Sequence, residues 1–188
     1  MKAQQEIVMN KHTFVILSVL LLVLLTSCTS GLADDESSAD KYQTVKSYNS
    51  NITMEFPKDW DDDGHQLAYA SIEMYSYSRN QAVIVVEENM EDFVDDITID
   101  DYAWFVLQSV QDVFGTTQIP AIEDIQIGDG IYGKQFEISG EIEYRKLTYL
   151  ATCAEAKGIM VQFRIVSLQS EYDEMKPIFD NILNSFHI

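Results

Sequence analysis

Ile52-Thr53-Met54-Glu55-Phe56-Pro57-Lys58-Asp59-Trp60 is the stretch of sequence that says most about the fold. Apolar and polar residues alternate from Ile52 to Phe56, which predicts a strand with one buried face. Pro57 ends this strand, because proline has no backbone N–H to donate to a neighbouring strand. The stretch therefore predicts an early strand that leads into a turn at Trp60.

Three pairs of strands are predicted downstream of this turn. The first pair, 71–77 and 82–88, is joined by Ser78-Arg79-Asn80-Gln81. The second pair turns at Gly128-Asp129-Gly130, and the third turns at Glu155-Ala156-Lys157-Gly158. The paired segments are 122–127 with 132–138, and 141–154 with 158–168.

Alternation assigns the faces of these later strands. Tyr132, Phe136 and Ile138 lie opposite Gln135 and Glu137. In the last strand one face carries the apolar side chains Ile159, Val161, Phe163 and Ile165. Gln162 and Arg164 lie on the other face, which we expect to be the wetter one.

Two amphipathic helices complete the pattern. Thr98 offers an N-cap hydroxyl with Asp101 three residues later. An apolar stripe at helical spacing follows, made of Ile99, Ala103, Val106, Val110, Val113 and Phe114. Ser170 and Asp173 open a second helix, in which Pro177 predicts a kink or a start near the proline. Strands, a long helix, more strands and a terminal helix indicate an α+β fold, an antiparallel sheet covered by helices.

The stretch 52–60, together with Ile182-Leu183-Asn184-Ser185-Phe186, resembles the PsbP-like family, which includes an extrinsic photosystem protein and many bacterial lipoproteins. The resemblance implies a central antiparallel β-sheet between helical layers, a PsbP-like α/β/α sandwich, over one domain at 42–188. It implies no catalytic residue, because Phe56, Pro57 and Trp60 occupy packing and turn positions. It does not carry the photosystem role over to this chain.

The N-terminal segment predicts a lipoprotein signal peptide at 1–27. Lys11 and His12 precede an apolar run of twelve residues, Phe14 to Leu25, against the roughly 20 that cross a bilayer. Leu25-Thr26-Ser27-Cys28 resembles a lipobox, so Cys28 is the expected lipidation site; the alternative is secretion with an incidental cysteine. The Ser- and Asp-rich segment 28–41 is expected to be a flexible acidic tether.

The charge of the chain disfavours nucleic acid as a partner. It has 12 Lys and Arg residues against 31 Asp and Glu residues, a formal net charge of −19. Such a surface repels phosphate backbones and anionic lipid headgroups. If Cys28 is acylated, Cys153 has no cysteine partner within the chain, so no internal disulfide is expected.

The residues needed for common catalytic sites are missing from the mature sequence. It has only His65 and His187, and no Gly-x-Ser-x-Gly, His-Glu-x-x-His or Gly-rich phosphate-loop motif. Cys153 alternates with Leu147, Tyr149 and Ala151 on an apolar strand face. A thiol buried there has a raised pKa and low reactivity, so we predict a core cysteine and no enzyme.

An acidic turn, Asp59-Trp60-Asp61-Asp62-Asp63-Gly64, is the candidate metal site. Asp59, Asp61 and Asp63 followed by glycine match the first half of a calcium-loop pattern. Ala70 replaces the usual bidentate Glu, and a strand precedes the turn, so this is no EF-hand. Calcium is the only cofactor that the sequence suggests, and the alternative is a solvated acidic turn.

Two aromatic residues of the first helix, Trp104 and Phe105, fall off its apolar stripe. Aromatic side chains rimmed by polar groups suit a protein-binding patch. The alternative is that the loop 88–97, with Met90 and Phe93, folds back over them.

These features together predict a lipid-anchored accessory or binding lipoprotein on the extracytoplasmic side of a bacterial membrane. Its expected partner is an envelope protein or a small ligand. The alternatives are a calcium-binding lipoprotein that uses the turn 59–64, and an enzyme whose pocket gathers acids distant in sequence.

Overall fold

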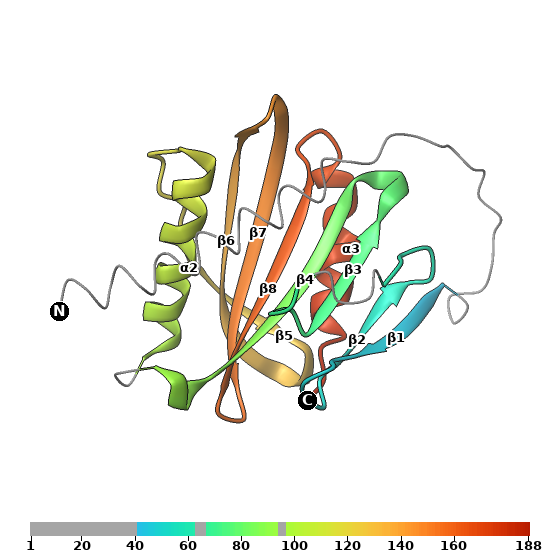
Figure 1. The fold of residues 1–188 in the computed structure, drawn as a ribbon, viewed down its shortest axis with the longest axis vertical. Helices are drawn as coiled ribbons and strands as arrows, with labels where there is room; N and C mark the ends of the chain where they lie inside the picture. The colour runs from blue at the N-terminus through green and yellow to red at the C-terminus, as the bar shows by residue number, and fades with distance from the viewer. Residues whose placement is uncertain (1–40, 63–66, 94–96) are drawn as a thin grey trace.

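The structure is a computed structural model that describes residues 41–62, 67–93 and 97–188. A six-stranded antiparallel sheet with the order β3-β4-β8-β7-β6-β5 forms its centre (Figure 1). These strands are β3 (Ile72–Ser76), β4 (Gln81–Asn89), β5 (Glu123–Ile127), β6 (Ile131–Ile142), β7 (Arg145–Ala156) and β8 (Ile159–Leu168).

A separate two-stranded sheet pairs β1 (Tyr42–Lys46) with β2 (Thr53–Pro57). β2 is the predicted strand of the stretch 52–60, whereas β1 was not predicted. Thr53 and His187 exchange backbone hydrogen bonds of 2.8 and 3.0 Å, so the C-terminus is tied to β2.

Two helices lie on opposite faces of the central sheet. α2 (Ile99–Phe114) packs on β6 and β7, and α3 (Tyr172–Asn184) packs on β8 and on β2 (Figure 1). A Cβ atom on Gly140 of β6 would lie 2.5 Å from Cδ1 of Phe114, so α2 sits close against the sheet at this point. The α+β class and the sheet between helical layers are therefore confirmed.

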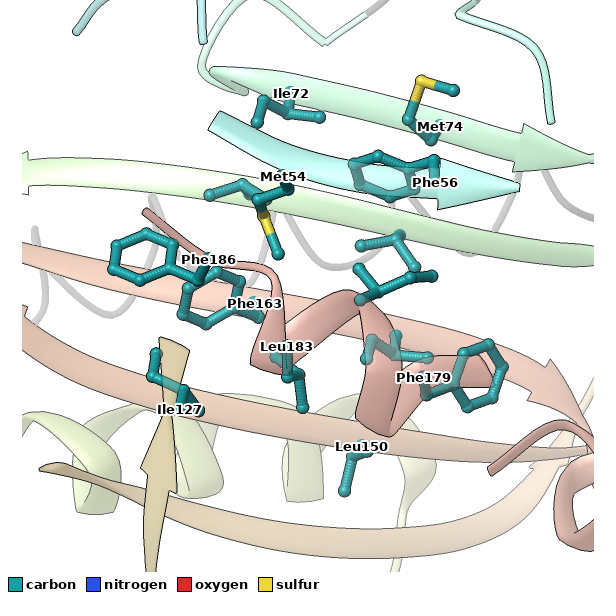
Figure 2. Close-up of a cluster of buried hydrophobic side chains, with 14 of the residues drawn as sticks. Met54, Phe56, Ile72, Met74, Ile127, Leu150, Phe163, Phe179, Leu183 and Phe186 are labelled. Carbon is teal, nitrogen blue, oxygen red and sulfur yellow. The ribbon is translucent and has the colours of Figure 1, made fainter. Parts of the chain in front are cut away.

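Each face of the sheet has its own apolar core. The α3 side buries Phe163 under Phe186, with the rings edge to face at 5.2 Å, and includes Met54 and Phe179 (Figure 2). Trp60 belongs to this core at 1 % exposure, 6.5 Å from the Phe179 ring. The packing role that the resemblance implied for Phe56 and Trp60 is confirmed.

The turn between β6 and β7 was not predicted. The prediction began one strand at Glu141, but β6 runs to Ile142 and β7 begins at Arg145. Glu143 and Tyr144 between them have φ values of 47° and 67°. Such a turn usually carries Asn and Gly, so Glu-Tyr gave no signal in the sequence.

One further expectation was wrong. Gln162 and Arg164 are buried, because the second face of β8 is covered as well as the first. Tyr132 keeps the strand parity of Phe136 and Ile138 but is exposed, because it lies near the start of β6. α3 begins at Tyr172, next to the Ser170 signal and not near Pro177, and its N-cap residue is Glu171, without a side-chain capping bond.

Candidate functional site on the outer face of helix α2

α2 is fixed at its first turn by a reciprocal capping arrangement. The Thr98 hydroxyl accepts from the Asp101 backbone N–H at 3.2 Å, and the Asp101 carboxylate accepts from the Thr98 N–H at 3.2 Å and from its hydroxyl at 2.6 Å. These hydrogen bonds lower the pKa of Asp101. The capping box predicted from Thr98 and Asp101 is confirmed.

The inner face of α2 buries the predicted stripe against the sheet. Ala103, Val106 and Val110 are buried in the core on this side, and the Phe114 ring meets the Tyr149 ring at 6.4 Å. The amphipathic pattern thus sets the rotation of the helix about its own axis. Tyr102 and Leu107, which flank the stripe, are buried with it.

Trp104 and Phe105 are exposed on the opposite side, at 40 % and 46 %. Acidic and polar side chains on the same helix are exposed near them: Asp100, Asp101, Gln108 and Asp112. We call Trp104, Phe105 and these four residues the α2 patch. Lys134 of β6 lies beside it and pairs with Asp100 at 2.7 Å.

The loop before α2 packs against a different side of the helix. The Phe93 ring meets the buried Tyr102 ring edge to face at 5.9 Å, and the Met90 N–H donates to the Gly158 carbonyl at 3.2 Å. The described part of this loop leaves Trp104 and Phe105 exposed, so the alternative in which it covers them is not what the structure shows.

In the acidic turn the carboxylates of Asp59 and Asp62 contact neighbouring side chains. Asp59 pairs with Arg79 at 3.7 Å, and Asp62 accepts from the Tyr48 hydroxyl, which raises the pKa of Tyr48 to about 12. Asp61 exchanges backbone hydrogen bonds with Tyr75. Asp63 and Gly64 lie outside the described residues. Within 41–62, 67–93 and 97–188, no three His, Cys, Asp or Glu side chains gather as a metal-binding group, and calcium binding stays a prediction.

The remaining candidates are placed as follows. Cys153 is buried in β7, and burial raises the pKa of its thiol well above the usual range, as predicted. Cys28 and His65 lie outside the described residues. The helices in the described ranges are all too short or too polar to cross a membrane.

The buried polar side chains of β8 are the feature that sequence reasoning missed. Gln162 and Arg164 are 1 % and 2 % exposed, although alternation placed them on the wetter face. A signal in the sequence was the pair of apolar residues Leu67 and Ala70, which belong to the same buried cluster as the inner face of α2.

No protein-family model matches the chain. No curated protein matches it either. Its similarity to known proteins comes from solved structures, and the three described below are each less than 20 % identical to it.

The solution structure of cyanobacterial PsbP from Synechocystis covers 87 % of this chain and 98 % of its own, with 18 % identity and a TM-score of 0.57. LpqN, described as involved in cell envelope biogenesis of Mycobacterium tuberculosis, covers 77 % and 88 %, with 13 % identity and a TM-score of 0.51. The Ran-binding protein Mog1p of Saccharomyces cerevisiae covers 78 % and 95 %, with 12 % identity and a TM-score of 0.54. At such identities the likeness shows the architecture alone, and the chain therefore has the PsbP-like fold that the stretch 52–60 indicated.

Proposed function

We propose that this chain is a lipid-anchored, extracytoplasmic binding protein without catalytic activity, which holds a basic protein partner on its α2 patch. The observation that carries the proposal is the exposure of Trp104 and Phe105 next to each other on a helix whose other aromatic residues, Tyr102 and Phe114, are buried. Large aromatic side chains are common energetic centres of protein interfaces.

The charge around the patch selects the kind of partner. Asp100, Asp101 and Asp112 surround the two rings, and the chain as a whole has a net charge of −19. A partner with Lys and Arg around an apolar centre is complementary to this surface, and charge complementarity raises the association rate. We therefore expect binding to weaken as salt concentration rises.

The anchor is supported by the sequence 25–28, which resembles a lipobox and makes Cys28 the first residue after the predicted signal peptide at 1–27. Solved structures of this fold include one described as involved in cell envelope biogenesis and one named for binding another protein. The first description is compatible with a place in the cell envelope, and the second with a protein-binding role.

The experiment places a photo-crosslinking phenylalanine analogue at position 105 of the full chain in intact cells, with the same analogue at exposed Tyr132 as the control. We expect position 105 to capture a defined basic protein and position 132 not to. Equal capture at both positions would contradict the proposal.

Affinity for the captured protein is then measured for Trp104→Ser and Phe105→Ser, with Ile119→Ser as the matched control because Ile119 is also exposed. Each patch variant should lose about 2 kcal/mol of binding free energy, roughly 30-fold in Kd, with an unchanged melting temperature. Unchanged affinity in both variants would exclude the α2 patch as the interface.

A further inference from the structure

A buried guanidinium lies on the α2 side of the sheet with much of its hydrogen-bonding capacity unused. Arg164 of β8 is 2 % exposed, and its Nη2 donates to Oε1 of Gln162 at 2.7 Å. Its Nε and Nη1 have no hydrogen-bond partner among the described residues. The ring of Tyr69 covers the guanidinium, with its centroid 5.6 Å from Cζ.

A second buried donor belongs to the same region. Tyr149 of β7 is 1 % exposed, and its hydroxyl also has no hydrogen-bond partner in the described part of the chain. Burial raises the pKa of Tyr149, and the positive charge of Arg164 opposes that rise, so the two groups interact electrostatically. We call Arg164, Gln162, Tyr149 and Tyr69 the Arg164 cluster.

The carboxylates on this face do not neutralise Arg164 directly. Ile84 separates it from Glu73 across the β3-β4-β8 register. Glu73 accepts instead from the Leu67 N–H at 2.7 Å and from the Tyr75 hydroxyl at 3.3 Å. Glu88 accepts from the Tyr102 hydroxyl. Arg164 forms no ion pair within the described ranges, and a buried charge without a partner costs folding free energy.

Two elements line this side of the sheet. α2 packs on β6 and β7 (Figure 1). Leu67, Tyr69 and Ala70 belong to the apolar cluster on this side, and the Tyr69 ring lies against the guanidinium of Arg164 in β8. Ala151 lies directly across the β7–β8 pair from Arg164, so a small apolar side chain lies beside the guanidinium.

We propose that the Arg164 cluster is a binding site for a small monocarboxylate, whose carboxylate accepts from the unpaired Arg164 nitrogens and the Tyr149 hydroxyl. A carboxylate matches a guanidinium in geometry and in charge. Arg164 is a single cation, and Glu73 and Glu88 add negative charge on the same face of the sheet. This balance favours a ligand with one negative charge over a phosphate, which carries two. Ile84 and Ala151 on the neighbouring strands favour a short apolar remainder.

The test follows the Nε–Hε NMR resonance of Arg164 in nitrogen-15-labelled protein, assigned by its loss in Arg164→Lys. The probes are sodium acetate and sodium butyrate, with ionic strength held constant by sodium chloride, and butyramide as the uncharged analogue of butyrate. We expect a saturable shift and a higher melting temperature with the two carboxylates, and neither change with butyramide.

Variants locate the effect. Tyr149→Phe removes only a hydroxyl and should weaken carboxylate binding by about tenfold while the protein stays folded. Arg164→Gln should abolish binding if it folds. Lys146→Gln, which removes an exposed cation from the same strand as Tyr149, should bind as the wild type does.

Three results would overturn the proposal. One is the absence of a saturable shift with either carboxylate, which would mean that water alone satisfies these donors. Another is an equal shift with chloride or butyramide. The third is wild-type affinity in Tyr149→Phe together with weaker binding in Lys146→Gln. Because the α2 patch is not part of this cluster, none of these three results bears on the partner-binding proposal, which has its own test.

Discussion

At the scale of single residues, Cys153 is a thiol whose chemistry is set by burial. It lies in β7 opposite Gln162, and burial raises the pKa of the thiol, an effect that the charge of Arg164 only partly opposes. Thiol reagents attack the thiolate, so the folded protein should react very slowly.

We predict that Cys153 in the Cys28→Ser variant resists a colorimetric disulfide reagent at pH 8 and reacts fully in denaturant. Cys28→Ser is chosen because it leaves one thiol in the chain. The measurement is the rate of thiol modification with and without guanidinium chloride. A folded protein that reacts as fast as free cysteine would show that the thiol is accessible.

Single residues also show what the alternation of apolar and polar side chains along a strand can predict and what it cannot. Alternation correctly placed Cys153 on an apolar face, because every second side chain of a strand points to the same face of the sheet. It assigned Arg164 to a wetter face, because alternation gives the two sides of a strand but not what covers each side. Asp59 and Asp61 matched a metal pattern by spacing, whereas their contacts to Arg79 and to the Tyr75 backbone depend on strands brought together by the fold.

At the scale of elements, the first turn of α2 has a measurable effect on stability. Replacing Thr98 by Ala removes the hydroxyl that accepts from the Asp101 N–H. Loss of an N-cap residue of this kind costs about 1 kcal/mol of unfolding free energy. We expect this loss in urea denaturation at pH 7, and no comparable loss for Gln108→Ala, a change in the exposed middle of the same helix.

The pH dependence of this cap follows from the pKa of Asp101. Its hydrogen bonds to Thr98 lower that pKa below the unfolded value. The carboxylate therefore stabilises the fold above the unfolded pKa, and the contribution is lost as pH falls through the folded pKa. The difference in stability between wild type and Thr98→Ala should shrink on acidification below about pH 4. A constant difference down to pH 2 would contradict this account.

Elements differ in how well the sequence predicts them. α2 was predicted together with its N-cap residue, because an apolar stripe and a capping pair are local signals in the sequence. The β6–β7 hairpin was not, since Glu143 and Tyr144 adopt positive φ without the residues that usually do so. The start of α3 lies one residue from the cap that Ser170 indicated, because Glu171 takes the N-cap position, and the alternative start near Pro177 is wrong.

At the scale of the whole molecule, the fold separates two surfaces that the proposals use. The α2 patch is exposed on the outside of the helix, whereas the Arg164 cluster is buried on the side of the sheet that α2 covers. The class and the order of layers were predictable, because strand and helix periodicities are strong over 42–188. The placement of Leu67–Ala70 against β8 was not, because it depends on long-range packing.

The arrangement predicted for the whole chain, in which an expected signal peptide at 1–27 and an expected acidic tether at 28–41 precede the domain, implies that attachment depends on one thiol. We expect the wild type to incorporate an alkyne-labelled palmitate and to stay with membranes in an alkaline carbonate wash. Cys28→Ser should lose the label and move to the wash, because two or more acyl chains give an attachment that a protein without them lacks. Cys153→Ser is the matched control and should keep both label and attachment, since Cys153 lies buried in β7. Label that persists in Cys28→Ser, or a wild type that is released by the wash, would show that Cys28 is an incidental cysteine.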